Sequence, residues 1–235
     1  MDETIEVVVV RVFTDDRGAN GNELGIVRSS TATAGREQAI ASALGFSETV
    51  FLDALSEDGE LGRVATIRIF TPAAELPFAG HPSVGTAWWL AEQGTPITML
   101  REKAGVVDVT YGSEDEPTWI TAEAEWAPTF QWLPLESPAD VDALDPFAFT
   151  EGQHYAYAWI DESVAHLRSR MFAPAMGIVE DEATGAAAIA LTARLGRDLR
   201  ISQGEGSELL TAIEGDDRIG VGGRTVYDRT ISATL

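Results

Sequence analysis

Cysteine is absent from this 235-residue chain, and Lys103 is its only lysine. The lack of cysteine excludes disulfides, thiolate metal sites and thiol catalysis. A pyridoxal phosphate enzyme would need Lys103 for its Schiff base. That lysine stands in a charged Arg-Glu-Lys stretch, so we do not expect such an enzyme. Any chemistry must therefore use oxygen or nitrogen groups.

Positive charge is also scarce. Against 38 acidic residues the chain has only 16 basic ones, which gives a formal net charge of -22 at pH 7. A surface of that sign repels nucleic acid phosphates and anionic lipid headgroups, so we expect neither a nucleic acid nor a membrane as a partner. An anionic small molecule would need a local positive feature, for instance the N-terminus of a helix.

Long apolar runs are missing as well. No stretch reaches the roughly 18 to 20 apolar residues that cross a bilayer. After Met1-Asp-Glu-Thr4 the chain enters an apolar run from Val7 to Val12, without the basic region or the cleavage site of a signal peptide. We therefore expect a cytoplasmic protein.

The composition that is present, 45% hydrophobic and 23% charged, is that of an ordinary globular protein. Apolar periodicity and turn signals predict both strands and helices. The predicted strands are Val7–Phe13, Phe46–Asp53, Arg63–Thr71, Ile97–Glu102 and Val106–Tyr111, and the predicted helices are Ala34–Leu44, Pro82 to the residue before Gly94, and Thr184–Leu195. The proline-containing segment 126–146 predicts short strands and loops.

The sequence also predicts two halves. Polar residues fill the stretch from Gly112 to Pro117, which indicates a boundary between residues 1–112 and 113–235. Arg68-Ile-Phe-Thr-Pro72 recurs as Arg170-Met-Phe-Ala-Pro174, 170 − 68 = 102 positions later. A glycine-containing loop and a helix of small residues follow each copy. If the halves pair around a pseudo-twofold axis, two helix N-termini offer unpaired N–H groups to an anion in one crevice.

Five blocks in order carry a resemblance to a known family. They are Ser47-Glu-Thr-Val-Phe51, Phe70-Thr-Pro72, Ala79-Gly-His-Pro82, Phe172-Ala-Pro174 and Glu180-Asp-Glu-Ala-Thr-Gly185. At this spacing the chain resembles the PhzF-like phenazine biosynthesis family, over most of its length. The resemblance implies the α/β (α+β) fold of diaminopimelate epimerase, in which two pseudo-symmetric halves each curl a mostly antiparallel sheet around a central helix. The active site then lies between the halves, and a homodimer is expected.

The resemblance also implies the roles of individual residues. Glu48 matches the glutamate that moves a proton on a dihydro-hydroxyanthranilate ring, and burial that raises its pKa would suit that role. His81 and Asp181 match residues that contact the substrate and assist proton transfer. By the same match the substrate-binding residues are Asn22, Gly80, Pro82, Thr184, Gly185 and Ala186. Ala186 stands where the family has a serine.

The resulting hypothesis is an isomerase without metal or cofactor, acting on a small cyclic or unsaturated carboxylic acid. An inactive carboxylate-binding protein of the same fold is the alternative. Gly220-Val-Gly222-Gly223 lies too near the end of the sequence to open a dinucleotide-binding unit and predicts a hairpin turn. Ser83 is not expected to be a nucleophile, and His154 and His166 lack the spacing of a helical metal pair.

Overall fold

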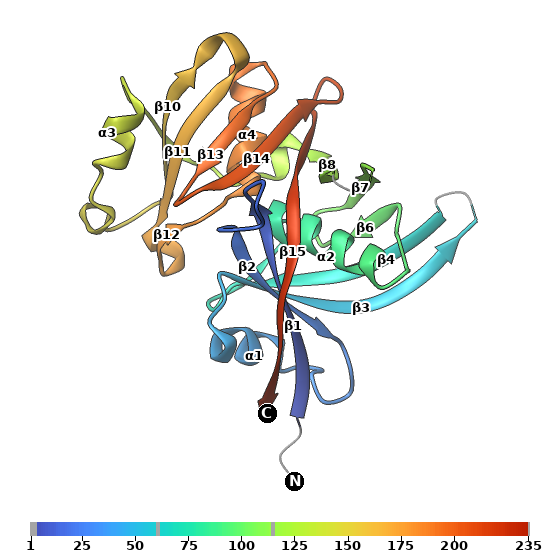
Figure 1. Cartoon of the computed structure of the whole chain (residues 1–235). Coiled ribbons are helices and arrows are strands. Elements are labelled where there is room, and N and C mark those ends of the chain that lie inside the picture. The colour runs from blue at the N-terminus through green and yellow to red at the C-terminus, as the bar shows by residue number, and fades with distance from the viewer. Residues whose placement is uncertain (1–3, 60–61, 114–115, 235) are drawn as a thin grey trace.

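The computed structural model describes residues 4–59, 62–113 and 116–234, which form two lobes (Figure 1). One mixed 15-stranded sheet passes through both lobes. Its strands are β1 (Thr4–Thr14), β2 (Asn22–Arg28), β3 (Glu48–Asp58), β4 (Gly62–Phe70), β5 (Glu75–Leu76), β6 (Met99–Arg101), β7 (Val106–Tyr111), β8 (Thr118–Glu123), β9 (Gln131–Pro134), β10 (His154–Asp161), β11 (His166–Ala173), β12 (Ile178–Asp181), β13 (Arg200–Gln203), β14 (Ser207–Ile213) and β15 (Arg218–Thr234). The α-helices are α1 (Glu37–Leu44), α2 (Gly80–Glu92), α3 (Pro138–Asp142) and α4 (Gly185–Leu195).

In the first lobe the strands form a closed ring. The order runs β1-β2-β3-β4-β6-β7-β8-β15, and β15 then pairs with β1 to complete the circle. Helix α2 belongs to this lobe and is buried on nearly every side, as expected of a helix that is apolar all round. A side chain at Gly85 would meet Val12 and Leu24, so this glycine lets α2 pack closely on β1 and β2.

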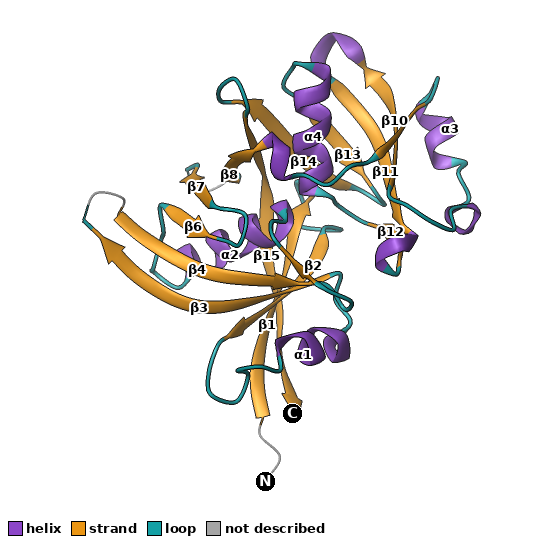
Figure 2. Cartoon of the chain, turned by 180° about the vertical axis from the view of Figure 1, so that it is seen from behind, coloured by secondary structure: helices purple, strands orange, loops and turns teal. Residues whose placement is uncertain are grey.

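The second lobe curls an open sheet, β15-β14-β13-β11-β10-β9, beside α4 (Figure 2). Its strand pairing repeats that of the first lobe. In the first lobe β3 and β4 are antiparallel, β4 and β6 are parallel, and β6 and β7 are antiparallel. In the second lobe β10 and β11 are likewise antiparallel, β11 and β13 parallel, and β13 and β14 antiparallel. The predicted fold of two similar halves, each a curled sheet with a central helix, is confirmed.

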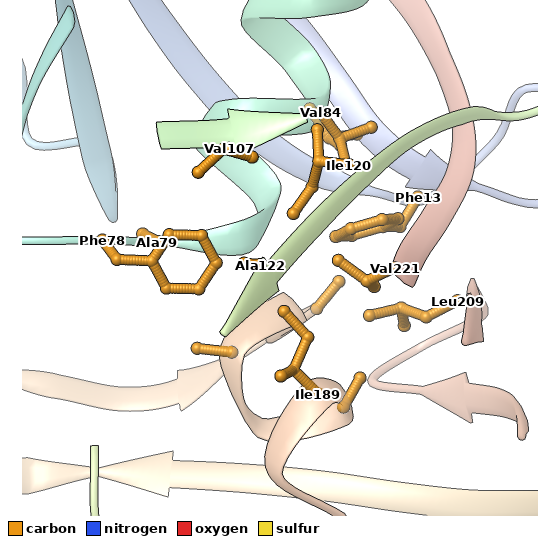
Figure 3. Close-up of a cluster of buried hydrophobic side chains, with 14 of the residues drawn as sticks. Phe13, Phe78, Ala79, Val84, Val107, Ile120, Ala122, Ile189, Leu209 and Val221 are labelled. Atoms are coloured by element: carbon orange, nitrogen blue, oxygen red, sulfur yellow. The ribbon is translucent and has the colours of Figure 1, made fainter. Parts of the chain in front are cut away.

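A single hydrophobic cluster joins the two lobes. Val84 of α2 and Ile120 of β8 lie on one side, and Ile189 of α4 and Leu209 of β14 on the other, with Val221 of β15 between them (Figure 3). Each of these side chains is fully or almost fully buried. The relative position of α2 and α4 is therefore fixed by packing rather than by a flexible linker.

Most predicted elements are present with small shifts at their ends. Helix α1 begins at Glu37 rather than at Ala34, because turns that include Gly35 at φ +77° precede it. Helix α2 begins two residues before the predicted Pro82. No helix among the described residues is long and apolar enough to span a membrane.

One expectation from the sequence is incomplete and another is wrong. Segment 126–146 contains the expected short strand, β9, and loops, but also the short helix α3, whose N-cap Ser137 accepts a hydrogen bond from the backbone N–H of Asp140. Gly222 and Gly223 lie inside β15 and not in a hairpin turn. A Cβ atom at Gly222 would collide with the ring of Trp119, and one at Gly223 with the ring of Phe13, so these glycines make room for two aromatic side chains.

The expected boundary between residues 112 and 113 falls in the connection from β7 to β8, where residues 114 and 115 lie outside the described residues. The last strand does not stay with the second lobe. Residues 218–223 of β15 pair with β8, and residues 224–234 pair with β1. The final strand thus completes the sheet of the first lobe.

The acidic surface leads to a prediction about salt. Raising the ionic strength from 0.1 to 1 M shortens the screening length from about 10 to about 3 Å, which weakens repulsion among the excess acidic residues. We expect the midpoint of thermal unfolding to rise by several degrees in KCl. A midpoint that falls would show that screening of exposed ion pairs such as Arg229–Glu23 outweighs the loss of repulsion.

Candidate active site

The N-termini of the two central helices touch each other. A Cβ atom built on Gly80 would lie 2.9 Å from the Cα of Gly185, and one built on Gly185 would lie 2.9 Å from the Cα of Gly80. No side chain fits at either position, so the backbones of the first residues of α2 and α4 pack directly together. The free N–H groups and the partial positive charges of both helices are thereby concentrated in one place.

A cavity of about 220 Å³ lies at this junction. Its polar lining includes Glu48, His81, Asp181 and Thr184, together with the helix-start residues Gly80, Gly185 and Ala186. Most of the remaining wall is apolar and is formed by Leu76, Pro77, Phe78, Ala79, Trp126, Pro128, Phe130, Met171, Ala173, Met176 and Ile178, with Gln153 as one further polar residue. The structure thus gathers seven of the predicted site residues around one space.

Glu48 is the first residue of β3, and β3 pairs in parallel with β2 so that Glu48 lies opposite Leu24. Only 7% of Glu48 is exposed, and its Oε2 atom has no hydrogen-bond partner. Burial, followed by the negative charge of nearby Asp181, raises the pKa of Glu48 to about 8. A carboxyl group in this state can exchange a proton near neutral pH.

His81 is the second residue of α2 and is 3% exposed. Its Nδ1 atom lies 3.4 Å from Oε2 of Glu48, and its Nε2 atom has no hydrogen-bond partner. Burial lowers the pKa of His81 to about 3, so the imidazole is neutral at neutral pH. The contact with Glu48 is therefore between a neutral ring and a carboxyl group, and not an ion pair.

Asp181 ends β12 and is 6% exposed. Its two oxygens accept hydrogen bonds from Asn22 Nδ2 at 2.7 Å and from Thr184 Oγ1 at 2.5 Å. Burial raises the pKa of Asp181 to about 6, while these two hydrogen bonds oppose the rise. Because Asp181 and Glu48 influence each other, the two carboxyl groups titrate as a pair.

Asn22 connects the two carboxyl groups across the lobes. Its Oδ1 accepts a hydrogen bond from Ser47, the neighbour of Glu48, at 2.9 Å. Its Nδ2 donates both to Asp181 and to the carbonyl of Ala183. Asn22 and Pro82 are not among the described residues that line the cavity. Asn22 instead orients Asp181, and Pro82 is buried in the first turn of α2.

Gln203 was not predicted as a site residue, although the Gln203-Gly204 dipeptide is visible in the sequence. Its Nε2 donates to the carbonyl of Asp181 at 3.0 Å and to Thr184 Oγ1 at 2.9 Å. Its Oε1 accepts from the hydroxyl of Tyr155 and from the backbone N–H of Thr184. Gln203 therefore holds the start of α4 and the Asp181 loop in place.

Among the described residues, no three His, Asp or Glu side chains are grouped so that they could hold a metal ion. The arrangement instead supplies two protonatable carboxyl groups, a neutral imidazole and two helix N-termini around an apolar space. Such a site can hold an organic anion and move a proton on it.

Structural comparison first identifies the class of fold. A hydroxyproline epimerase from Agrobacterium vitis, solved with bound trans-4-hydroxy-L-proline, superposes with a TM-score of 0.65 at 11% identity, over 99% of this chain and 93% of that one. A PhzF-family phenazine biosynthesis protein from Bacillus anthracis superposes with a TM-score of 0.78 at 21% identity, over 99% and 100% of the two chains. The chain therefore has the two-lobed fold found in these proteins.

Sequence comparison identifies the family. The profile described as "Phenazine biosynthesis-like protein" matches residues 10–148 and 127–216. A trans-2,3-dihydro-3-hydroxyanthranilate isomerase from Pseudomonas aeruginosa is 33% identical, over 88% of this chain and 85% of its own length. Its namesake from Pseudomonas chlororaphis is 32% identical, over 75% and 74%. The chain belongs to the phenazine biosynthesis-like protein family.

The glycine junction predicts the effect of adding one methyl group. Gly80→Ala forces the two helix starts apart and should lower the free energy of unfolding by about 1–3 kcal/mol, a typical cost of overpacking. Chemical denaturation measures the effect. Gly215→Ala is the matched control, because a Cβ atom there meets nothing within 4 Å. Equal stability of the two variants would contradict the close contact.

A second prediction concerns the hydrogen bonds to Asp181. Thr184→Val removes the hydroxyl that donates to Oδ2, and therefore should raise the pKa of Asp181 further. Carbon-13 NMR titration of the Asp181 carboxyl group measures this shift directly. Thr110→Val, an exposed substitution on β7, serves as the control. An unchanged titration midpoint in Thr184→Val would show that the hydroxyl does not stabilise the ionised form.

Proposed function

We propose that the protein is a cofactor-independent isomerase that moves a proton on a small cyclic or unsaturated carboxylic acid. The observation that carries the proposal is the position of Glu48. Its buried, unpartnered oxygen belongs to a cavity at the junction of two helix N-termini. A buried carboxyl oxygen without a hydrogen-bond partner is costly to maintain, which favours a role in chemistry.

The helix N-termini provide the binding part of the mechanism. A substrate carboxylate is held by backbone N–H groups at the starts of α2 and α4, near Gly80 and Gly185. This local positive charge allows an anion to bind a protein whose net charge is -22. The apolar rings of Phe78, Trp126 and Phe130 surround the carbon skeleton and exclude water.

The proton transfer is carried by the carboxyl pair. Near neutral pH the pair Glu48 and Asp181 holds one proton between its members, since the pKa of one lies near 8 and that of the other near 6. The proton resides mainly on Glu48, which has the higher pKa, and Glu48 becomes the base in the smaller fraction of molecules in which the proton has passed to Asp181. In that state ionised Glu48 removes a proton from one carbon of the substrate. The C–H electron pair then shifts along the adjacent double bond, and Glu48 returns the proton to the carbon at the far end. Product and substrate are isomers, so no other reactant is needed.

The family relatives support this substrate class. The proteins from Pseudomonas aeruginosa and Pseudomonas chlororaphis carry the name trans-2,3-dihydro-3-hydroxyanthranilate isomerase. A dihydro-hydroxyanthranilate-type acid combines a ring, a double bond and a carboxylate, which match the apolar wall, the acid/base pair and the helix N-termini. Acid/base catalysis by Glu48, with His81 and Asp181 beside it, is part of the proposal. A homodimer and a cytoplasmic location remain predictions.

Removing the proton carrier tests the proposal. Glu48→Gln keeps the size and polarity of the side chain but cannot take a proton, so turnover of trans-2,3-dihydro-3-hydroxyanthranilate should fall by about 10²–10⁴-fold. Binding of the stable analogue 2-aminobenzoate should remain. Turnover is followed by absorbance and binding by calorimetry.

Deuterium exchange separates the enzyme from an inactive binding protein. In D₂O the wild-type protein should introduce deuterium at carbon in the substrate, and Glu48→Gln should not. Glu92→Gln is the matched control, because this glutamate lies at the exposed end of α2 and is not part of the cavity lining. Ligand binding with no exchange that depends on Glu48 would favour the inactive alternative.

The pH dependence follows from the same pair. Below a pH of about 6 both carboxyl groups become protonated and no base remains. Above about 8 both become ionised, and the second negative charge opposes the negative charge that develops on the substrate. The plot of kcat/KM against pH should therefore be bell-shaped between these values. Asp181→Asn should remove the alkaline limb, because Glu48 then titrates alone and must still be ionised to act as the base. A limb that His81→Asn removes would contradict the neutral state of that histidine.

A further inference from the structure

Glu102 is a buried carboxyl group that the proposed mechanism does not use. It follows β6, is 7% exposed, and is not part of the cavity lining. Its Oε1 atom lies 2.5 Å from the hydroxyl of Ser83, in the first turn of α2, and its Oε2 atom has no partner. Glu102 therefore lies beside the helix start that carries Gly80 and His81.

The hydrogen bonds around Ser83 indicate which form of Glu102 is present. Ser83 Oγ lies 2.7 Å from the carbonyl oxygen of Ala79 and 2.5 Å from the carboxyl oxygen of Glu102. A serine hydroxyl has one proton and cannot donate to both acceptors. Both contacts become hydrogen bonds if Glu102 is protonated and donates to Ser83, while Ser83 donates to Ala79. An ionised Glu102 would also leave a charged oxygen buried without a partner.

The second lobe holds a neutral side chain at the equivalent position. In the first lobe Thr66 of β4 pairs with Arg101, and the next residue is Glu102. In the second lobe Arg168 of β11, the counterpart of Thr66, pairs with Ser202, and the next residue is Gln203. Glu102 and Gln203 therefore occupy equivalent positions. Gln203 holds the start of α4 through Thr184. The neutral amide of Gln203 thus holds the start of α4 as Glu102 holds the start of α2. This correspondence is consistent with a neutral carboxylic acid at Glu102.

We propose that Glu102 is a positioning residue that is held as a neutral carboxylic acid and fixes the first turn of α2. Ionisation of Glu102 weakens the binding of a substrate carboxylate. The inference rests on the carboxylate site of the proposed function. An ionised Glu102 adds a negative charge beside the positive end of α2, and the chain from Glu102 through Ser83 to Ala79 loses its proton. Substrate binding is therefore coupled to the protonation of a residue outside the cavity.

The surroundings of Glu102 support a pH response in the alkaline range. Burial raises its pKa to about 8, and the contacts with Ser83 and with the Ala79 backbone oppose the rise. Charged groups near Glu102 include His81 on α2, the exposed Arg101 beside it in the chain, and Lys103, which pairs with Glu75 of β5. Glu48, in contact with His81, titrates in the same pH range. His81 is already neutral in this range, so Glu48 is the group whose ionisation must be separated from that of Glu102.

The experiment removes Glu48 from the titration. Calorimetry measures the Kd of 2-aminobenzoate, whose carboxylate stays ionised, from pH 7 to pH 10 at constant ionic strength. In the Glu48→Gln protein we expect Kd to rise about tenfold, the effect of a coupling of one pKa unit. Adding Glu102→Gln, which copies the amide of Gln203, should remove most of this rise. Adding Glu92→Gln instead should leave the rise in Kd unchanged, although this substitution also removes one negative charge, at the exposed end of α2.

Thermal unfolding tests the neutral acid without a ligand. The folded pKa of Glu102 lies above its ordinary value, so its contribution to stability is present at low pH and is lost as pH rises through about 8. Between pH 6 and 9 the unfolding midpoint should fall less in Glu102→Gln than in Glu92→Gln.

The possible failures are distinct. Equal pH dependence of both midpoint and Kd in the Glu102→Gln and Glu92→Gln proteins would overturn the inference. Absence of 2-aminobenzoate binding in every variant at every pH would contradict the proposed carboxylate site, and with it the coupling to binding. In that case the unfolding curves still decide whether Glu102 is a neutral acid.

Discussion

The backbones of Gly80 and Gly185 touch where α2 and α4 begin, and the arrangement of the site depends on this contact. Two helix N-termini at van der Waals distance combine their partial positive charges, which a single helix end could not match. The contact also fixes the distance between the lobes, so that Glu48 from one and Asp181 from the other line the same cavity. The hydrophobic cluster behind the helices maintains the contact.

Burial then sets the protonation states of the site. Water is largely excluded from Glu48, Asp181 and His81, and burial disfavours the charged form of each side chain. The effect on the pKa is opposite for the two carboxyl groups and the imidazole. The carboxyl groups titrate closer to neutral pH, whereas the imidazole becomes a permanent neutral neighbour. Hydrogen bonds from Asn22 and Thr184 make Asp181 the stronger acid of the pair. Similar residues in water would not divide the roles of acid and base in this way.

Local patterns in the sequence predicted the central helices, most strands of the first lobe and the positions of Glu48, His81 and Asp181. These features depend on short-range periodicity, on glycines at the helix starts and on motifs that a family shares. The sequence did not reveal that β15 closes the first sheet, because pairing between residues about two hundred positions apart has no local signature. The supporting residues Gln203 and Glu102 were missed for the same reason, since their partners lie on elements that only the folded chain brings together.

The pairing of β1 with β15 also has a consequence for biosynthesis. On the ribosome β1 emerges before the other strands of the sheet and β15 after them, so the first lobe cannot close until β15 has left the exit tunnel. Until then β1 and β8 have free edges, which are prone to pair with other chains. Completion of the first lobe and assembly of the crevice are therefore late steps in folding, and a nascent chain truncated before β15 should be a target for chaperones and proteases.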